Sequence, residues 1–284
     1  MGATSESMNS LQVNGTELAC VERGEGQTII LVHGAIGDLR SWESVAIKLA
    51  ARHRVVTYSR RWHYPLYGAT NGAGYTAAIH TADLLGVMEH FGPSYLVGHS
   101  YGAALCAVAA LQRPGLVKSL VLAEPSLFPL LQFSGEGKQA EAEAAAASAH
   151  VPELLKQGQR VRALHEFLNI ILGTNGAERI PALGQEVMLD NLSTLGPMLA
   201  EMRADSLFTP QHAAAIKPPT LLLDGEHTPA IFRITIEEMQ KAIPNARRVT
   251  LPDVSHGLHL ENPTLFTETV QDFLAQFQKQ PAMA

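Results

Sequence analysis

Short, nearly uninterrupted apolar runs alternate with helical patterns along most of this chain. The runs occupy residues 28–32, 55–58, 95–97, 120–123, 220–223 and 248–251. Patterns typical of helices lie between or after them, at residues 41–51, 75–91, 102–113, 231–243 and 263–278. Strands that are apolar on both faces need helices on both sides of their sheet, and intervening helices let neighbouring strands run parallel. The alternation therefore predicts an α/β fold with a mostly parallel, doubly wound sheet.

The start of the chain has the pattern of a β-hairpin. Residues 11–13 and 16–22 flank Asn14-Gly15, a dipeptide that readily supplies the two positive φ angles of a type I′ turn. These two strands bring the expected sheet to about eight strands. Residues 1–10 are expected to form an N-terminal extension.

Almost one hundred residues between the runs at 120–123 and 220–223 interrupt the alternation and have helical character. The alanine-rich stretch 141–147 favours a helix. Residues 161–172 place Val161, Leu164, Leu168 and Ile171 on one helical face. An insert at the carboxyl end of a strand would overhang the crevice where open α/β sheets bind ligands.

We therefore expect a helical cap at residues 126–212, inserted after the sixth strand into a core formed by residues 11–125 and 213–284. The alternative is a helical extension that only enlarges the core.

Composition restricts the partners. The 284 residues include 21 Lys and Arg against 27 Asp and Glu, a net charge of −6 without a basic stripe, which argues against nucleic acid. Cys20 and Cys106 fall in a predicted strand and a predicted helix, so neither a disulfide framework nor a cysteine metal site is expected. Residues 1–10 lack a leader pattern and no run reaches about 18 apolar residues, so we expect a cytoplasmic protein without a membrane span. The oligomeric state stays open.

The stretch Gly98-His99-Ser100-Tyr101-Gly102 joins an apolar run to a helical pattern rich in small residues. Glycines two positions either side of a serine permit a tight strand-to-helix turn that exposes the hydroxyl as a nucleophile. Tyr101, at the helix start, would offer its backbone N–H to an anion. The alternative is an ordinary glycine-rich turn.

A serine hydroxyl needs a base to accept its proton, and the base needs a partner that holds its tautomer. Among the 12 histidines, His256 follows the last predicted strand and precedes the last helix. A loop at that carboxyl end lies on the same side of the sheet as Ser100. Other histidines in helices or polar connections are expected to be surface or packing residues, namely His53, His80, His90, His150, His165 and His212.

Three segments make residues 11–278 resemble the α/β-hydrolase fold enzymes: His33-Gly34-Ala35-Ile36-Gly37-Asp38 with Trp42, the stretch Gly98–Gly102, and His256 followed by Leu260-Glu261-Asn262-Pro263. The resemblance implies an α/β-hydrolase fold whose variable cap is the insert. It also implies an oxyanion hole built from the backbone N–H groups of Ala35 and Tyr101, where one donor is worth about 3–4 kcal/mol. His33 is expected to tie down its loop.

The residue that would hold the tautomer of His256, the acid of a Ser-His-acid triad, does not follow the commoner pattern of these relatives. Many place an Asp three residues after a Gly that follows the seventh strand, whereas Gly225 is followed there by Thr228, which carries no charge. Glu124 follows the sixth strand, 24 residues after Ser100, a spacing similar to relatives with their acid on that strand. We assign Glu124, with Glu226 and Asp224 as alternatives and a structural salt bridge as another reading of Glu124.

The segment after the fourth strand, Ser59-Arg60-Arg61-Trp62-His63-Tyr64-Pro65, also departs from the family's usual loop. We place Trp62 and His63, together with His99 and Phe128, in the substrate pocket. Arg60 could instead pair with a carboxylate and brace the loop. No metal is expected, because His256 and His259 lie three apart without a third ligand in a recognised pattern.

These residues predict a serine hydrolase that uses Ser100, His256 and Glu124, needs no cofactor, and cleaves a carboxylic ester or lactone through an acyl-enzyme. Apolar residues of the insert suggest a hydrophobic small-molecule substrate, and relatives of this appearance include small-ester esterases and enzymes that open macrocyclic lactone (macrolide) antibiotics. The alternatives are a non-hydrolytic or C–C bond enzyme of this fold, such as an acyltransferase or lyase, and a ligand-binding receptor with weak turnover. Dehalogenase and epoxide-hydrolase activities are disfavoured, because both need a carboxylate where Ser100 stands.

Overall fold

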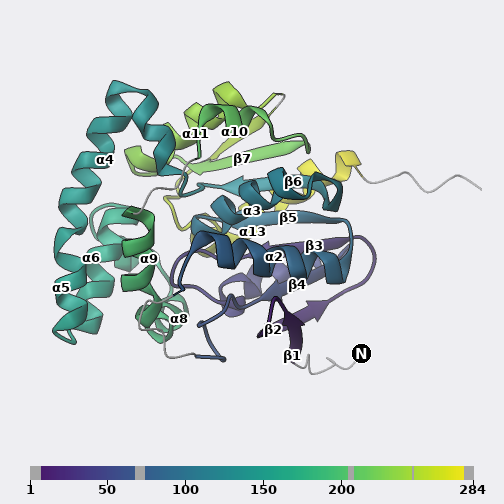
Figure 1. Ribbon diagram of the computed structural model, residues 1–284, viewed down its shortest axis with the longest axis horizontal. Helices are drawn as coiled ribbons and strands as arrows, with labels where there is room; N and C mark the ends of the chain where they lie inside the picture. Colours follow the sequence, from purple (N-terminus) through teal and green to yellow (C-terminus); the bar gives the residue numbers. More distant parts are fainter. Residues whose placement is uncertain (1–7, 68–73, 204–207, 245, 278–284) are drawn as a thin grey trace, which may run out of the picture.

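A computed structural model describes residues 8–67, 74–203, 208–244 and 246–277. Its centre is an eight-stranded sheet with the order β1-β2-β4-β3-β5-β6-β7-β8 (Figure 1). The strands are β1 (Asn9–Val13), β2 (Thr16–Arg23), β3 (Thr28–Val32), β4 (Arg54–Tyr58), β5 (Ser94–His99), β6 (Val117–Ala123), β7 (Thr220–Gly225) and β8 (Arg247–Leu251). Only the β1–β2 and β2–β4 pairs are antiparallel. The predicted mostly parallel α/β sheet and its number of strands are confirmed.

The amino-terminal hairpin forms as expected. Asn14 and Gly15 have φ angles of 45° and 69°, the positive values that the turn between β1 and β2 requires. β1 begins at Asn9, so the last residues of the range 1–10 belong to the sheet rather than to an extension. Residues 1–7 lie outside the described part of the chain.

Alternate residues of the central strands pack into two separate cores, which is why their sequences are apolar throughout. Ile30 and Val32 join the core beneath α2 (Ala77–Phe91) and α3 (Tyr101–Gln112). Ile29 and Leu31 join the opposite core, beneath α1 (Glu43–Leu49) and α13 (Pro263–Leu274). α11 (Ala230–Ala242) lies on the same face as α2 and α3.

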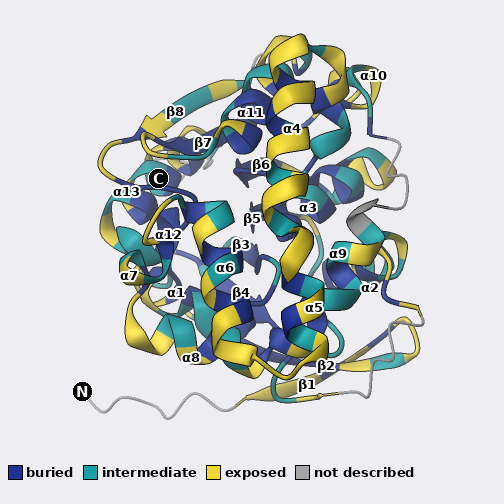
Figure 2. Cartoon of the chain, turned by 90° about the vertical axis from the view of Figure 1, so that its left-hand side faces the viewer, coloured by how far each residue is buried: buried dark blue, intermediate teal, exposed yellow. Residues whose placement is uncertain are grey.

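The chain between β6 and β7 forms helices in its described residues: η3 (Phe128–Phe133), α4 (Gly135–Ala147), η4 (Ser148–His150), α5 (Val151–Lys156), α6 (Arg160–Leu172), α7 (Gly176–Arg179), α8 (Ala182–Asp190), η5 (Leu192–Thr194), α9 (Leu195–Arg203) and α10 (Pro210–Ala214). In Figure 1, α4, α5, α6 and α9 lie together at one end of the strands. Figure 2 looks onto this end, where α4, α5 and α6 present exposed residues outward and buried ones inward.

The apolar face of α6 forms largely as expected, but it does not extend to Val161. The buried residues of this helix include Leu164, Phe167, Leu168 and Leu172, whereas Val161 is 56% exposed. Val161 lies on the same side of the helix as Leu168 and Leu172, but in the first turn, where it stays exposed. The expectation that the buried face includes Val161 is therefore wrong.

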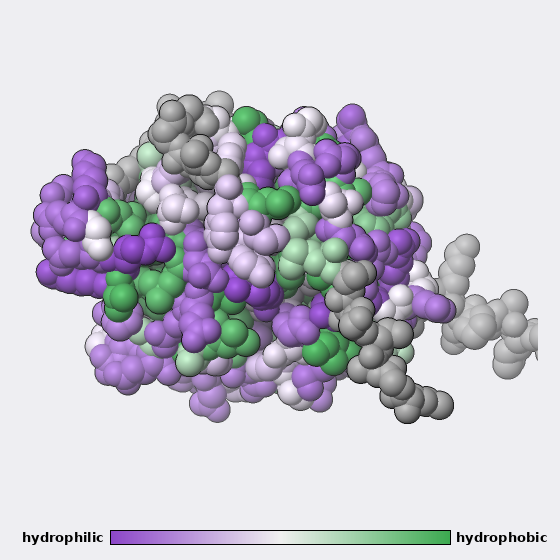
Figure 3. All heavy atoms as spheres, turned by 90° about the horizontal axis from the view of Figure 1, so that it is seen from below, coloured by the Kyte–Doolittle hydropathy of each residue, from purple (hydrophilic) through white to green (hydrophobic). Residues whose placement is uncertain are grey.

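Exposed large apolar side chains are spread over several elements, among them Ile47, Tyr67, Phe133, Val161 and Leu183. The face in Figure 3 correspondingly mixes hydrophilic surface with separate hydrophobic areas. Isolated apolar residues of this kind are ordinary on globular proteins. Within the described residues, no helix is both long and apolar enough to span a bilayer.

Candidate active site

Ser100 stands alone between β5, which ends at His99, and α3, which begins at Tyr101. Its φ and ψ of 53° and −120° belong to a strained, left-handed backbone. The flanking glycines explain how the turn fits: a Cβ on Gly98 would lie 2.6 Å from Cα of Ala103. A Cβ on Gly102 would lie 2.3 Å from the carbonyl oxygen of Val32. The sequence Gly98–Gly102 thus forms the sharp strand-to-helix turn that it predicts.

His256 lies in the loop after β8, and its imidazole is buried. Its Nδ1 lies 2.6 Å from Oε2 of Glu124, so Nδ1–H donates to that carboxylate. Phe232 of α11 stacks on the other side, with ring centroids 3.7 Å apart and planes 14° apart. A hydrogen bond at one edge and ring contacts with Phe232 and with His99, whose centroid lies 4.6 Å away, therefore hold the imidazole.

Glu124 follows β6 directly and has a φ of 45°. The backbone N–H of Gly225 donates to its Oε1 at 2.8 Å, and Oγ1 of Thr228 donates to its Oε2 at 2.6 Å. Both donors come from the end of β7 and the loop that follows. The carboxylate carried by one strand is thus held by groups from the neighbouring strand.

The two alternative acids have other partners. Asp224 accepts hydrogen bonds from Arg248 at 2.5 Å and from Oγ1 of Thr250 at 2.9 Å. Glu226 is exposed and accepts from the backbone N–H of Asp253 at 3.1 Å. Of the three carboxylates considered, Glu124 is the one that contacts His256.

Burial governs the protonation of this pair. Desolvation raises the pKa of Glu124 to about 8, while the hydrogen bonds from Thr228 and Gly225 act in the opposite direction. Desolvation lowers the pKa of His256 to about 3. Because the neutral imidazole is favoured, its Nε2 keeps a lone pair that can accept a proton.

The loop that follows β3 is held from beneath by His33 and Arg60, both buried. Nδ1 of His33 lies 2.9 Å from the carbonyl oxygen of Gly34, and its Nε2 accepts from the backbone N–H of Arg60 at 3.0 Å. His33 therefore ties down this loop, as expected. Nη2 of Arg60 donates to the carbonyl oxygens of Gly34 at 2.8 Å and Ala35 at 2.9 Å.

The alternative in which Arg60 pairs with a carboxylate is wrong for the described part of the chain, although Arg60 does brace a loop. Besides those two carbonyl oxygens, its guanidinium donates to the hydroxyl of Tyr75 at 3.2 Å. The guanidinium of Arg60 thus donates to backbone carbonyls of the loop after β3 instead of to a carboxylate.

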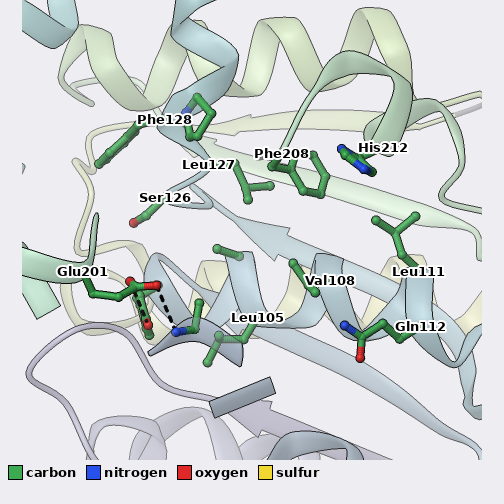
Figure 4. A pocket seen from close by; sticks show the side chains of 14 residues that line it. Leu105, Val108, Leu111, Gln112, Ser126, Leu127, Phe128, Glu201, Phe208 and His212 are labelled. Carbon is green, nitrogen blue, oxygen red and sulfur yellow. Dashed lines mark hydrogen bonds between the residues drawn. The ribbon is translucent and has the colours of Figure 1, made fainter. Parts of the chain in front are cut away.

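Two cavities lie beside the turn that carries Ser100, and Ser100 lines the smaller one. The smaller, of about 150 Å³, is lined by Ser100, Ala35 and Tyr101 and by insert residues that include Phe167, Ile171 and Met198. The larger, of about 440 Å³, extends along α3 (Figure 4). Tyr101, Ser126 and Phe128 line both cavities.

Of the four residues placed in the pocket from sequence, Phe128 lines both cavities, and Trp62, His63 and His99 line neither. Trp62 stacks on Tyr75. His63 is buried, with Nε2 3.1 Å from the carbonyl oxygen of Ala35. His99 donates from Nε2 to the carbonyl oxygen of His256 at 2.7 Å. These three side chains support the loops around the site.

Sequence reasoning missed Ser126, whose Oγ lies 3.2 Å from Oγ of Ser100. It also missed Phe232, which stacks on His256, and Glu201, which lines the larger cavity. It treated Thr228 only as a residue without the charge of an acid and did not predict its hydrogen bond to Glu124. No sequence motif marks Ser126 or Phe232. Ser126 meets Ser100, and Phe232 meets His256, only because separate elements pack together in the fold.

Among the described residues, Glu226, His227 and Asp253 could share a cation, since their ligand atoms lie within 4.8 Å of one another. All three are exposed, and exposed acidic groups are common without an ion. His256 and His259 form no such group: His256 contacts Glu124, and His259 packs on Trp42.

A sequence profile described as the alpha/beta hydrolase family matches residues 29–269. The chain is 28% identical over 258 residues to the sn-1-specific diacylglycerol lipase ABHD11 of Mus musculus, covering 87% of this chain and 80% of that protein. The enol-lactonase from Burkholderia xenovorans LB400 superposes with a TM-score of 0.72 at 23% identity, covering 94% and 100% of the two chains. The esterase RhEst1 from Rhodococcus sp. ECU1013 superposes with a TM-score of 0.76 at 22% identity, covering 97% and 100%.

Proposed function

Because the chain belongs to the alpha/beta hydrolase family, we propose that it is a serine hydrolase that cleaves a carboxylic ester or lactone. Ser100 is the nucleophile, His256 the general base and Glu124 the acid that orients the base. The observation that carries the proposal is the 2.6 Å contact between Nδ1 of His256 and Oε2 of Glu124. The strained turn that carries Ser100 supports it.

The reaction follows from these roles. Oγ of Ser100 attacks the carbonyl carbon while Nε2 of His256 accepts the hydroxyl proton, and the carbonyl oxygen becomes an oxyanion. The backbone N–H groups of Ala35 and Tyr101 would stabilise that charge. Collapse breaks the bond to the alkoxide, which takes the proton from His256. Water, deprotonated by His256, then releases the acid and restores Ser100.

The lining of the two cavities supports an apolar substrate. Insert residues Phe167, Ile171 and Met198 share the smaller cavity with Ser100, so the insert would act as the cap of the site. That cavity has a volume of about 150 Å³, below the roughly 300–1,000 Å³ of typical ligand pockets. It favours a small alcohol group or small lactone over a macrocyclic lactone. The names of the relatives, a lipase, a lactonase and an esterase, agree with this substrate class.

Hydrolysis of 4-nitrophenyl butyrate by the purified full chain tests the proposal. We expect turnover in the wild type, loss of at least about 1,000-fold in Ser100→Ala, and covalent labelling by a fluorophosphonate that maps to Ser100. Ser126→Ala is the matched control, since Ser126 presents a second hydroxyl 3.2 Å away, and it should keep the label. Ligand binding without Ser100-dependent turnover would instead indicate a receptor.

A further inference from the structure

The larger cavity follows one face of α3 from the nucleophile outward. Its α3 residues are Tyr101, Ala104, Leu105, Val108, Leu111 and Gln112, spaced as a single helical face. At a rise of about 1.5 Å per residue, the eleven steps from Tyr101 to Gln112 span about 16 Å. The cavity is therefore an elongated groove, with one end at Ser126 beside Ser100 and the other at His212 and Gln112 (Figure 4).

The middle of this groove is apolar. In Figure 4, Val108 and Leu111 on α3 face Leu127 and Phe208 on the opposite wall. Polar residues lie at the two ends, and the far-end residues Gln112 and His212 are exposed. An elongated apolar space of this kind disfavours charged groups, and binding in it becomes more favourable with each methylene that is removed from water.

Among the described residues that line the groove, the one acidic side chain already has hydrogen-bond partners. Glu201 accepts from the backbone N–H of Ala77 at 3.0 Å and from the hydroxyl of Tyr101 at 3.4 Å. Its role is to join α9 to the starts of α2 and α3, so it does not select a cationic ligand. The chemistry of the groove is that of its apolar side chains.

The position of His256 decides which half of an ester would enter the groove. The base must reach the leaving oxygen, and its ring stacks on Phe232, which lines the smaller cavity. The leaving alcohol therefore belongs in the smaller cavity. The acyl half stays bonded to Ser100. The groove along α3 begins beside Ser100, because Tyr101, Ser126 and Phe128 line both cavities and Oγ of Ser126 lies 3.2 Å from Oγ of Ser100.

We propose that the groove along α3 binds the unbranched acyl chain of the substrate, so that the protein hydrolyses esters of long-chain carboxylic acids with small alcohols. This inference rests on the proposed function. A zigzag chain with bonds of about 1.5 Å advances about 1.3 Å per carbon, so about 12 carbons fill the 16 Å groove.

A series of 4-nitrophenyl esters from two to sixteen acyl carbons tests this assignment, because only the acyl arm varies. In the wild type, kcat/KM should rise at least 100-fold between the shortest chain and about 12 carbons, and then level off. Val108→Trp should block the groove seven residues, or about 10 Å, beyond Tyr101. It should lower kcat/KM at least tenfold for chains longer than about eight carbons and leave butyrate unchanged.

Val161→Trp is the matched control, since Val161 lines neither cavity and is exposed; it should reproduce the wild-type profile. A second series, acetates of alcohols of increasing length, should be insensitive to Val108→Trp. An equal loss at all acyl lengths, an unchanged profile in a folded Val108→Trp protein, or a loss confined to long alcohols would overturn the assignment.

A binding measurement separates this inference from the proposed function. A fluorescent C16 fatty acid should bind the Ser100→Ala variant, and at least tenfold more weakly when Val108→Trp is added. If no ester is hydrolysed but this difference is found, the groove assignment stands and the proposed function fails. If esters are cleaved by Ser100 and the fatty acid binds both variants equally, the groove assignment fails alone.

Discussion

Thr228 donates a 2.6 Å hydrogen bond from its hydroxyl to Oε2 of Glu124, the oxygen that also faces Nδ1 of His256. Thr228 occupies the position after the seventh strand where many relatives carry the acid itself. In this chain the carboxyl group that contacts His256 belongs to the residue after β6, and the loop after β7 supplies a neutral donor to it. Thr228 therefore belongs to the same hydrogen-bond network as His256 and Glu124, although it does not carry the acid itself.

The first prediction concerns the identity of the acid. Glu124→Gln keeps the shape of the side chain but cannot hold Nδ1–H of His256 as a carboxylate does, so kcat should fall by about 10³–10⁴. Glu226→Gln is the matched control, because Glu226 is exposed and bonds to Asp253. Steady-state kinetics with 4-nitrophenyl butyrate measures both. A large loss in Glu226→Gln with near-normal Glu124→Gln would move the acid to the loop after β7.

A second prediction is that a carboxylate at position 228 can partly replace Glu124. Thr228 and Nδ1 of His256 contact the same carboxylate oxygen, so a carboxylate at position 228 should come within reach of the imidazole. Glu124→Ala with Thr228→Asp is expected to recover at least tenfold in kcat over Glu124→Ala alone. The same Thr228→Asp change in the presence of Glu124 should lower activity, because two carboxylates would repel one another. No recovery in a folded double variant would contradict this geometry.

The third prediction is a shift in pH dependence. The active form has Glu124 ionised and His256 neutral, so activity is lost as the pH falls and the pair takes up a proton. The hydrogen bond from Thr228 lowers the pKa of Glu124 against the effect of burial. Thr228→Val removes it, and the acid limb of the kcat/KM profile should move up by about one pH unit. A shift toward lower pH would contradict the assigned role of the hydroxyl.

A fourth prediction concerns Arg60. The Gly34 carbonyl that accepts its 2.8 Å hydrogen bond belongs to the same peptide as the Ala35 N–H, so the guanidinium orients that N–H and increases its polarity. Arg60→Met should lower kcat at least tenfold with little change in KM. It should weaken the binding of a boronic-acid transition-state analogue by the same factor as kcat.

Arg162→Met, at an exposed i,i+4 pair with Glu166, is the control for the Arg60 variant and should have no effect on kcat. Thermal unfolding shows whether Arg60→Met remains folded at the assay temperature. Equal losses in kcat and in ground-state affinity would indicate a general distortion instead of a positioning role.

The fifth prediction tests the turn that carries the nucleophile. Gly102→Ala would bring a Cβ to 2.3 Å from the carbonyl oxygen of Val32, and the resulting overpacking should lower the free energy of unfolding by at least about 1–3 kcal/mol. Gly115→Ala is the matched control, because nothing lies within 4 Å of its added Cβ. Chemical denaturation of the two variants gives the comparison. Equal stabilities would mean that α3 does not pack against β3 as closely as described.

Much of the fold could be predicted because its signals are local. The apolar runs mark buried strands, Asn14-Gly15 marks the hairpin turn, and Gly98–Gly102 marks the turn at Ser100. The exposure of Val161 could not be predicted in this way, because it shares the helical face of the buried Leu168 and Leu172. Whether the first turn of α6 is covered depends on which elements pack against it, and the helical pattern does not encode that.

Local residue patterns were enough to predict the parallel α/β architecture, the insert after β6, and the serine and histidine proposed as nucleophile and base. They could not predict that Glu124 rather than Asp224 or Glu226 contacts His256, that Arg60 binds carbonyls of the loop after β3, or that an apolar groove follows α3. These features depend on residues that lie far apart along the chain. Glu124 and His256 are 132 residues apart, and their contact depends on strand order and side-chain packing, which no local pattern of residues encodes.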